Sequence, residues 1–103
     1  MLVEPGKVLS ETSVPNWVYG KWNYNDDKGK QTTVSIFEDG SALGIDNTIG
    51  SWYYIEDRLY IVWMNGWTDV ITKDGSGYKK LGFKAGSPTD GPPTNTSPAQ
   101  KLK

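Results

Sequence analysis

Turn-forming residues recur through the middle of this chain roughly every 8–10 residues, which is the spacing typical of short antiparallel strands. The turn signals are Asp26-Asp27-Lys28-Gly29, Asp39-Gly40, Asp46-Asn47, Glu56-Asp57, Asn65-Gly66 and Asp74-Gly75. The runs between them are rich in Val, Ile, Thr, Tyr and Trp, and none has a helical period with capping residues. The pattern predicts an all-β fold, a small antiparallel up-and-down meander of about six or seven strands that forms a barrel or a two-layer sandwich.

The breakers and the composition divide the chain into three parts. Residues 1–15 are predicted to be irregular, residues 16–85 to form the β domain, and residues 86–103 to form an extended tail with little packing of its own, because this tail holds four of the six prolines and no aromatic residue. The expected strands are residues 17–24, 31–38, 41–46, 50–55, 58–64, 67–73 and 77–84.

Two-residue turns predict how neighbouring strands pair. A turn at Asp39-Gly40 pairs Ile36 with Leu43 and Val34 with Ile45, which gathers four aliphatic side chains on one face. We therefore expect that face to be buried.

The same reasoning applies to the hairpins at Glu56-Asp57 and Asn65-Gly66, which set Gly50 opposite Trp63. One face then collects Trp52, Tyr54, Leu59, Ile61, Trp63 and Val70, and is expected to be core. The opposite face collects Tyr53, Tyr60, Val62, Met64, Trp67, Asp69 and Ile71. Because this second face is too apolar to be plainly solvated, three interpretations stay open: a neighbouring sheet covers it, a second copy of the chain covers it, or it is a platform for a ligand.

The composition narrows the function classes. The chain has no cysteine and no histidine, so it lacks a thiolate nucleophile, the commonest general base and the commonest metal ligands. Its net charge is −1, from 11 basic and 12 acidic residues, which argues against nucleic acid or an anionic membrane as partner. No secretory signal or apolar run of membrane-spanning length is apparent, so a soluble protein without cofactor or metal is expected.

Gly20-Lys21-Trp22 opens the first expected strand, and Gly50-Ser51-Trp52 repeats the form G-x-W-x-Y thirty residues later. A G-x-W at the first strand of a meander resembles the calycins, meaning lipocalins and avidins. The resemblance implies that Trp22 closes one end of a barrel. The expected strands are shorter than those of an eight-stranded ligand barrel, which argues against a roomy cavity.

The candidate site is the second, aromatic face of the hairpins. Tyr53, Tyr60, Met64 and Trp67 are expected to form the contact surface, with Asp69 and Asn65 supplying hydrogen bonds. The favoured function is a non-catalytic domain that binds carbohydrate or protein through this face. The alternatives are a homodimer or other homo-oligomer with no ligand, and a small hydrolase that uses carboxylates such as Asp69.

Overall fold

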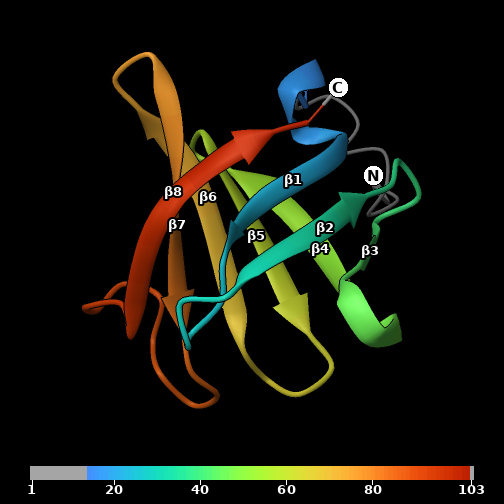
Figure 1. Cartoon of the computed structure of the whole chain (residues 1–103). Coiled ribbons are helices and arrows are strands. Elements are labelled where there is room, and N and C mark those ends of the chain that lie inside the picture. Colours follow the sequence, from blue (N-terminus) through green and yellow to red (C-terminus); the bar gives the residue numbers. More distant parts are fainter. Residues whose placement is uncertain (1–13, 103) are drawn as a thin grey trace, which may run out of the picture.

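The computed structural model describes residues 14–102, and within them eight antiparallel strands follow one another around a closed barrel (Figure 1). The strands are β1 (Gly20–Asn25), β2 (Gln31–Ile36), β3 (Ser41–Leu43), β4 (Ile49–Ile55), β5 (Arg58–Trp63), β6 (Thr68–Asp74), β7 (Gly77–Phe83) and β8 (Asn95–Lys101). Two 3₁₀ turns, η1 (Asn16–Val18) and η2 (Ile45–Asn47), complete the described elements. The predicted all-β meander is confirmed, and the barrel is the form it takes. No helix within residues 14–102 has the length and apolar character needed to cross a membrane.

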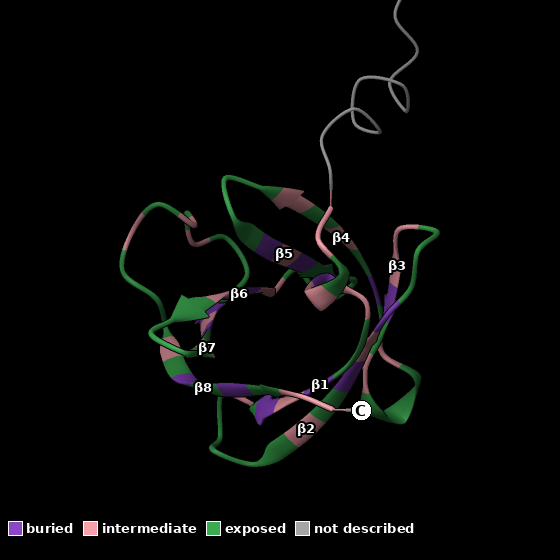
Figure 2. Cartoon of the chain, turned by 90° about the horizontal axis from the view of Figure 1, so that it is seen from above, coloured by how far each residue is buried: buried purple, intermediate pink, exposed green. Residues whose placement is uncertain are grey.

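Strand β8 lies inside the segment that was expected to be a loosely packed tail. It pairs with β7 on one side and with β1 on the other, as in the pairs Lys80 with Ser97 and Tyr24 with Ala99. Ser97 and Ala99 are buried, whereas Pro98 between them is exposed. Without β8, strands β1 and β7 would each present an edge of unpaired backbone groups. Pairing with these two edges stabilises residues 95–101 as a strand, although their own strand propensity is low. The strand closes the ring seen in Figure 2.

The hairpin between β4 and β5 has the predicted register. Glu56 and Asp57 adopt φ values of 52° and 65°, which are the left-handed conformations of a type I′ two-residue turn. Gly50 consequently lies opposite Trp63.

The other two predicted turns are longer by one residue, and both registers were wrong. Ile36 pairs with Ala42, and Ile61 pairs with Asp69, so each loop has three residues that end in a glycine of positive φ, Gly40 at 95° and Gly66 at 94°. In such a loop the glycine supplies the left-handed residue after a type I turn.

A shift of one residue exchanges the two faces of a strand. Ala42 is therefore buried while Leu43 and Ile45, predicted to be core, are exposed. On β6, Asp69 and Ile71 turn toward the barrel interior, and Ile71 belongs to the interior core cluster. Val70, predicted to be core, is buried but lies outside that cluster.

The end of the barrel beside η1 is packed with aromatic rings, and we call it the closed end. Trp17 of η1 contacts the rings of Trp22, Tyr54 and Tyr78 at centroid distances between 5.1 and 5.9 Å. Trp22 is fully buried, and its indole nitrogen donates a hydrogen bond to the carbonyl oxygen of Val18 at 3.1 Å. Trp22 thus belongs to the aromatic packing of the closed end.

Candidate functional site

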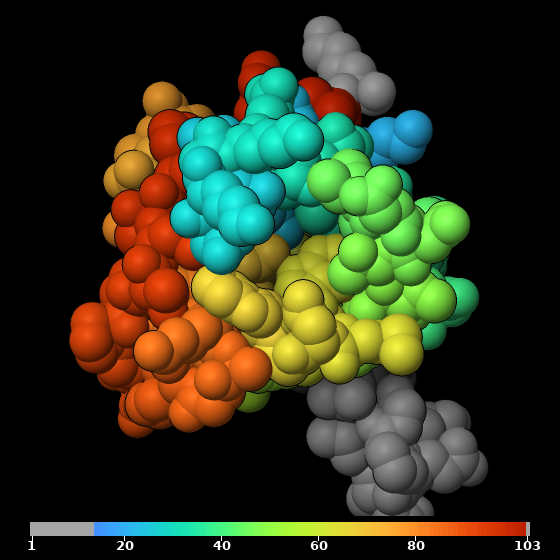
Figure 3. Space-filling view, turned by 60° about the horizontal axis from the view of Figure 1, so that its bottom comes forward, coloured from blue at the N-terminus to red at the C-terminus, as the bar shows by residue number. Residues whose placement is uncertain are grey.

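The opposite end of the barrel contains a cavity of about 450 Å³, which we call the open end. Figure 3 brings this end forward and shows the hollow among the loops that surround it. The lining residues are Tyr24, Asp26, Asp27, Lys28, Thr32, Val34, Gly44, Ile45, Asp46, Thr48, Trp63, Asn65, Trp67, Asp69, Lys80 and Asn95. The short strands were expected to leave no roomy cavity, but aromatic packing fills only the closed end and leaves space at the other.

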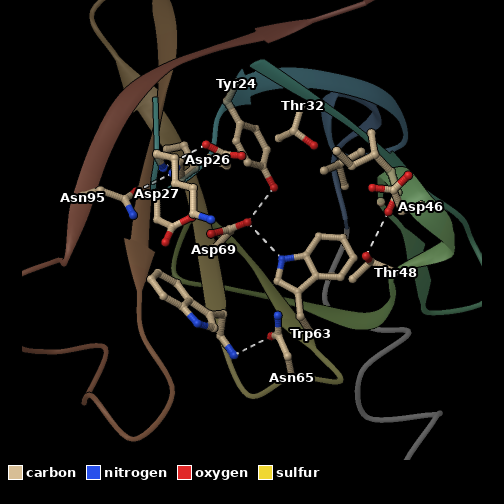
Figure 4. A pocket seen from close by; sticks show the side chains of 16 residues that line it. Tyr24, Asp26, Asp27, Thr32, Asp46, Thr48, Trp63, Asn65, Asp69 and Asn95 are labelled. Carbon is tan, nitrogen blue, oxygen red and sulfur yellow. Dashed lines mark hydrogen bonds between the residues drawn. The ribbon is translucent and has the colours of Figure 1, made fainter. Parts of the chain in front are cut away.

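Asp69 joins three strands inside the cavity. Its Oδ2 atom accepts a hydrogen bond from the Tyr24 hydroxyl of β1 at 2.8 Å and another from the Trp63 indole nitrogen of β5 at 2.9 Å (Figure 4). Both donors are neutral, and Oδ1 takes no part in either bond. The carboxylate is half-buried, because the register of β6 aims it inward among side chains that would otherwise form an apolar core.

Two glycines fix the position of the Trp63 indole. A Cβ atom on Gly50 would lie 2.8 Å from Cε3 of the ring, and one on Gly44 would lie 3.3 Å from Cη2, so the ring packs directly against bare backbone at both places. This packing directs the indole N–H toward Asp69.

Tyr24 remains protonated in this environment. Burial raises the pKa of its hydroxyl well above the usual value, and the negative charge of Asp69 together with the hydrogen bond to it raises that pKa further. Tyr24 therefore acts as a donor to Asp69 across the neutral pH range.

Lys80 of β7 is the buried cation of the site, with only 1% of its surface exposed. Its ammonium group donates a hydrogen bond to Oδ1 of Asn95 and lies 5.3 Å from the centre of the Tyr24 ring. Burial lowers the pKa of Lys80, while the charges of Asp69, Asp26 and Asp27 act in the opposite direction.

The rim of the cavity is acidic. Asp26 and Asp27 lie in the turn between β1 and β2, and Asp46 lies in η2. Backbone amides of Lys30 and Lys28 donate hydrogen bonds to Asp26 and lower its pKa, so this carboxylate is ionised at neutral pH.

The six residues predicted to share one face lie in two places. Trp67, Asp69 and Asn65 line the cavity inside the open end. Tyr53, Tyr60 and Met64 belong to the outer wall of the barrel, where the two tyrosine rings stack at 4.7 Å and Met64 is 78% exposed. The one-residue change of register at Asn65-Gly66 separates the two groups. The side-chain Oδ1 atom of Asn65 is itself used in that turn, accepting a hydrogen bond from the backbone amide of Trp67.

Several cavity residues were not predicted from the sequence. Trp63 was assigned to the core, and Tyr24 was given no role in the site. Lys80 follows Lys79 in the last predicted strand. The sequence did not indicate which of these two lysines points into the barrel. Asn95 lies in the segment predicted to be a tail, so nothing in the sequence connected it with Lys80.

The donor set of this site does not suggest a metal centre. Within residues 14–102, no three or more carboxylates cluster closely enough to hold a metal ion, and histidine and cysteine are missing from the chain.

Comparison of the chain with protein-family models, with curated proteins and with solved structures gives no significant match.

Proposed function

We propose that this domain is a non-catalytic binding protein that holds a small polar ligand in the open end of its barrel. The observation that supports this most is the cavity of about 450 Å³, a size within the range of roughly 300–1,000 Å³ that is usual for small-molecule sites. Its lining combines two indoles with a few converging polar groups. In small-molecule sites the apolar surface usually provides affinity and the polar groups orient the ligand.

Carbohydrate remains a candidate ligand class under this proposal. A sugar ring would stack against the indole of Trp67, and the Oδ1 atom of Asp69, which is not used in the bonds from Tyr24 and Trp63, would accept a hydroxyl hydrogen bond. The hydrogen bonds from Tyr24 and Trp63 hold the carboxylate in place before a ligand arrives, so little side-chain entropy is lost on binding.

The test is a titration with sugars and other small molecules, followed by the chemical shifts of the tryptophan indole N–H groups. We expect a ligand to shift the Trp67 and Trp63 signals, and the Trp67→Ala variant to bind it at least about tenfold more weakly. Tyr53→Ala is the matched control, because it removes an aromatic ring from the outer wall and should leave binding unchanged. If no compound shifts the two indole signals, or if both variants bind equally well, the proposal fails.

The outer wall of β4 and β5 supports a second candidate function, self-association. Ile49, Tyr53, Ile55 and Val62 are exposed there, next to the loop residue Met64. Exposed apolar side chains gathered on one wall favour contact with a second copy of the chain. Light scattering across a dilution series tests this: we expect a dimer that Tyr53→Lys dissociates, and a monomer mass at all concentrations would exclude it. The two candidates use opposite sides of the barrel wall, so each can be tested without disturbing the other.

A further inference from the structure

We infer that the ligand of the open end carries a positive charge, and that its cationic group is an organic ammonium seated between Asp69 and the indoles of the cavity. This inference rests on the proposed binding function and names the chemical class that the site selects. Three features of the cavity carry it: the state of the Asp69 carboxylate, the balance of charge in the lining, and the aromatic surface.

The first feature is a carboxylate whose hydrogen-bond donors are both uncharged side chains. Asp69 accepts from a tyrosine hydroxyl and from an indole N–H, and neither donor brings a positive charge. Among residues 14–102, both of these hydrogen bonds go to Oδ2 and none to Oδ1, on a side chain that is half-buried and lines the cavity. An ammonium group placed there would gain a charge-assisted contact in a partly desolvated setting, where such contacts are stronger than in water.

The second feature is an excess of negative charge in the lining. Four aspartates line the cavity against two lysines, although the whole chain is nearly neutral at −1. The ammonium group of Lys80 is already committed, because it is buried against Asn95 and the Tyr24 ring. Lys80 offsets part of the field of Asp69, and the carboxylates of the rim outnumber the one remaining lysine. This field attracts cations into the opening and repels anions.

The third feature is aromatic surface in the same cavity. Trp63 and Trp67 both line it, and the face of an indole is the side-chain surface that attracts a cation most strongly. Indoles around a carboxylate are the usual means of holding an alkylated ammonium, since they replace its weak hydration without requiring hydrogen-bond donors from the ligand. A sugar would use the same rings but would gain little from the excess of carboxylates.

Three compounds of similar shape but different charge distinguish the effect of ligand charge on affinity from the effect of ligand shape. Choline is the cation, 3,3-dimethylbutan-1-ol is the neutral analogue, and 3,3-dimethylbutanoate is the anion. With wild-type protein we expect choline to bind at least about tenfold more tightly than the neutral alcohol, and the anion to be weakest. We also expect added sodium chloride to weaken choline binding while leaving the alcohol unaffected.

Two variants on one strand locate the effect. Asp69→Asn keeps the oxygen that accepts the two hydrogen bonds and removes the charge, so the preference for choline over the alcohol should fall to about twofold or less. Asp74→Asn removes the same charge from the other end of β6, and the preference should persist. The salt dependence of the wild-type protein gives an answer even if Asp69→Asn does not fold.

The outcomes distinguish the inference from the function on which it rests. If the neutral alcohol or a neutral sugar shifts the Trp63 and Trp67 signals while choline binds no more tightly, the cation inference is overturned and the binding function stands. If no compound shifts those signals, both are overturned. A choline preference that survives Asp69→Asn but not Asp74→Asn would also overturn the inference, because the charge that selects the ligand would then lie outside the cavity.

Discussion

Replacing Gly50 by alanine should destabilise the barrel, because the added methyl group has no space. A Cβ atom at this position would lie 2.7 Å from the carbonyl oxygen of Val62 and 2.8 Å from Cε3 of Trp63. The φ angle of Gly50 is not in the positive region, so the backbone itself accepts alanine and the steric contacts are the whole cost.

The size of the effect follows from what must move. Each of the two contacts has to lengthen by roughly half an ångström or more before it reaches ordinary van der Waals distance. One partner is the backbone of β5, and the other is an indole held by its hydrogen bond to Asp69. Overpacking of this kind costs about 1–3 kcal/mol, which for a domain of this size lowers the melting temperature by about 5–20 °C.

Chemical denaturation followed by tryptophan fluorescence measures the change in the free energy of unfolding. Gly77→Ala is the matched control, since Gly77 also lies in a strand without positive φ, and its Cβ would meet nothing closer than the Asp74 carbonyl oxygen at 3.9 Å. The control should be neutral or slightly stabilising, because alanine restricts the unfolded chain. Equal stability of the two variants would refute the steric account of the Gly50–Trp63 contact.

Three further substitutions test the interior, the closed end and a turn. Tyr24→Phe removes a donor to Asp69 and should lower the free energy of unfolding by about 1–3 kcal/mol at neutral pH. Because the pKa of Tyr24 is raised in the folded state, the wild-type protein should also lose stability as the pH rises above about 10. Denaturation between pH 8 and about 11 should show a smaller loss of stability for the variant, which lacks the hydroxyl. Trp22→Ala removes a fully buried indole, and calorimetry should record a loss of about 3–5 kcal/mol or no folded state at all. Gly66→Ala forces a positive φ of 94° on alanine and also places its Cβ 2.9 Å from Cβ of Ala85, so it should cost about 1–2 kcal/mol in urea denaturation. Gly75→Ala, also at positive φ but in open space, should cost no more, and a larger cost would contradict a contribution from the contact with Ala85.

The candidate site was predictable only in part. The length of one turn explains why its residues were identified but assigned to the wrong face. Trp67, Asp69 and Asn65 were selected as polar groups beside an indole and do line the cavity, but the assumed two-residue turn placed them on one face with Tyr53 and Tyr60, which lie on the outer wall. An Asn-Gly pair fits both a two-residue turn and the end of a three-residue loop. The sequence does not distinguish these turns, yet the choice decides whether Asp69 lies inside the barrel.

The amino-acid pattern by itself determined the class of fold, the order of most strands and the pairing of Gly50 with Trp63. These properties depend on local chemistry, namely alternation along a strand, left-handed residues at Glu56 and Asp57, and a missing side chain beside an indole. Only the tertiary structure decided that residues 95–101 form the strand that closes the ring. This strand depends on pairing with the open edges of β1 and β7, and not on the strand propensity of its own residues. The same closure brings Asn95 to Lys80 and Tyr24 to Asp69, contacts 15 and 45 residues apart in sequence that no local pattern encodes.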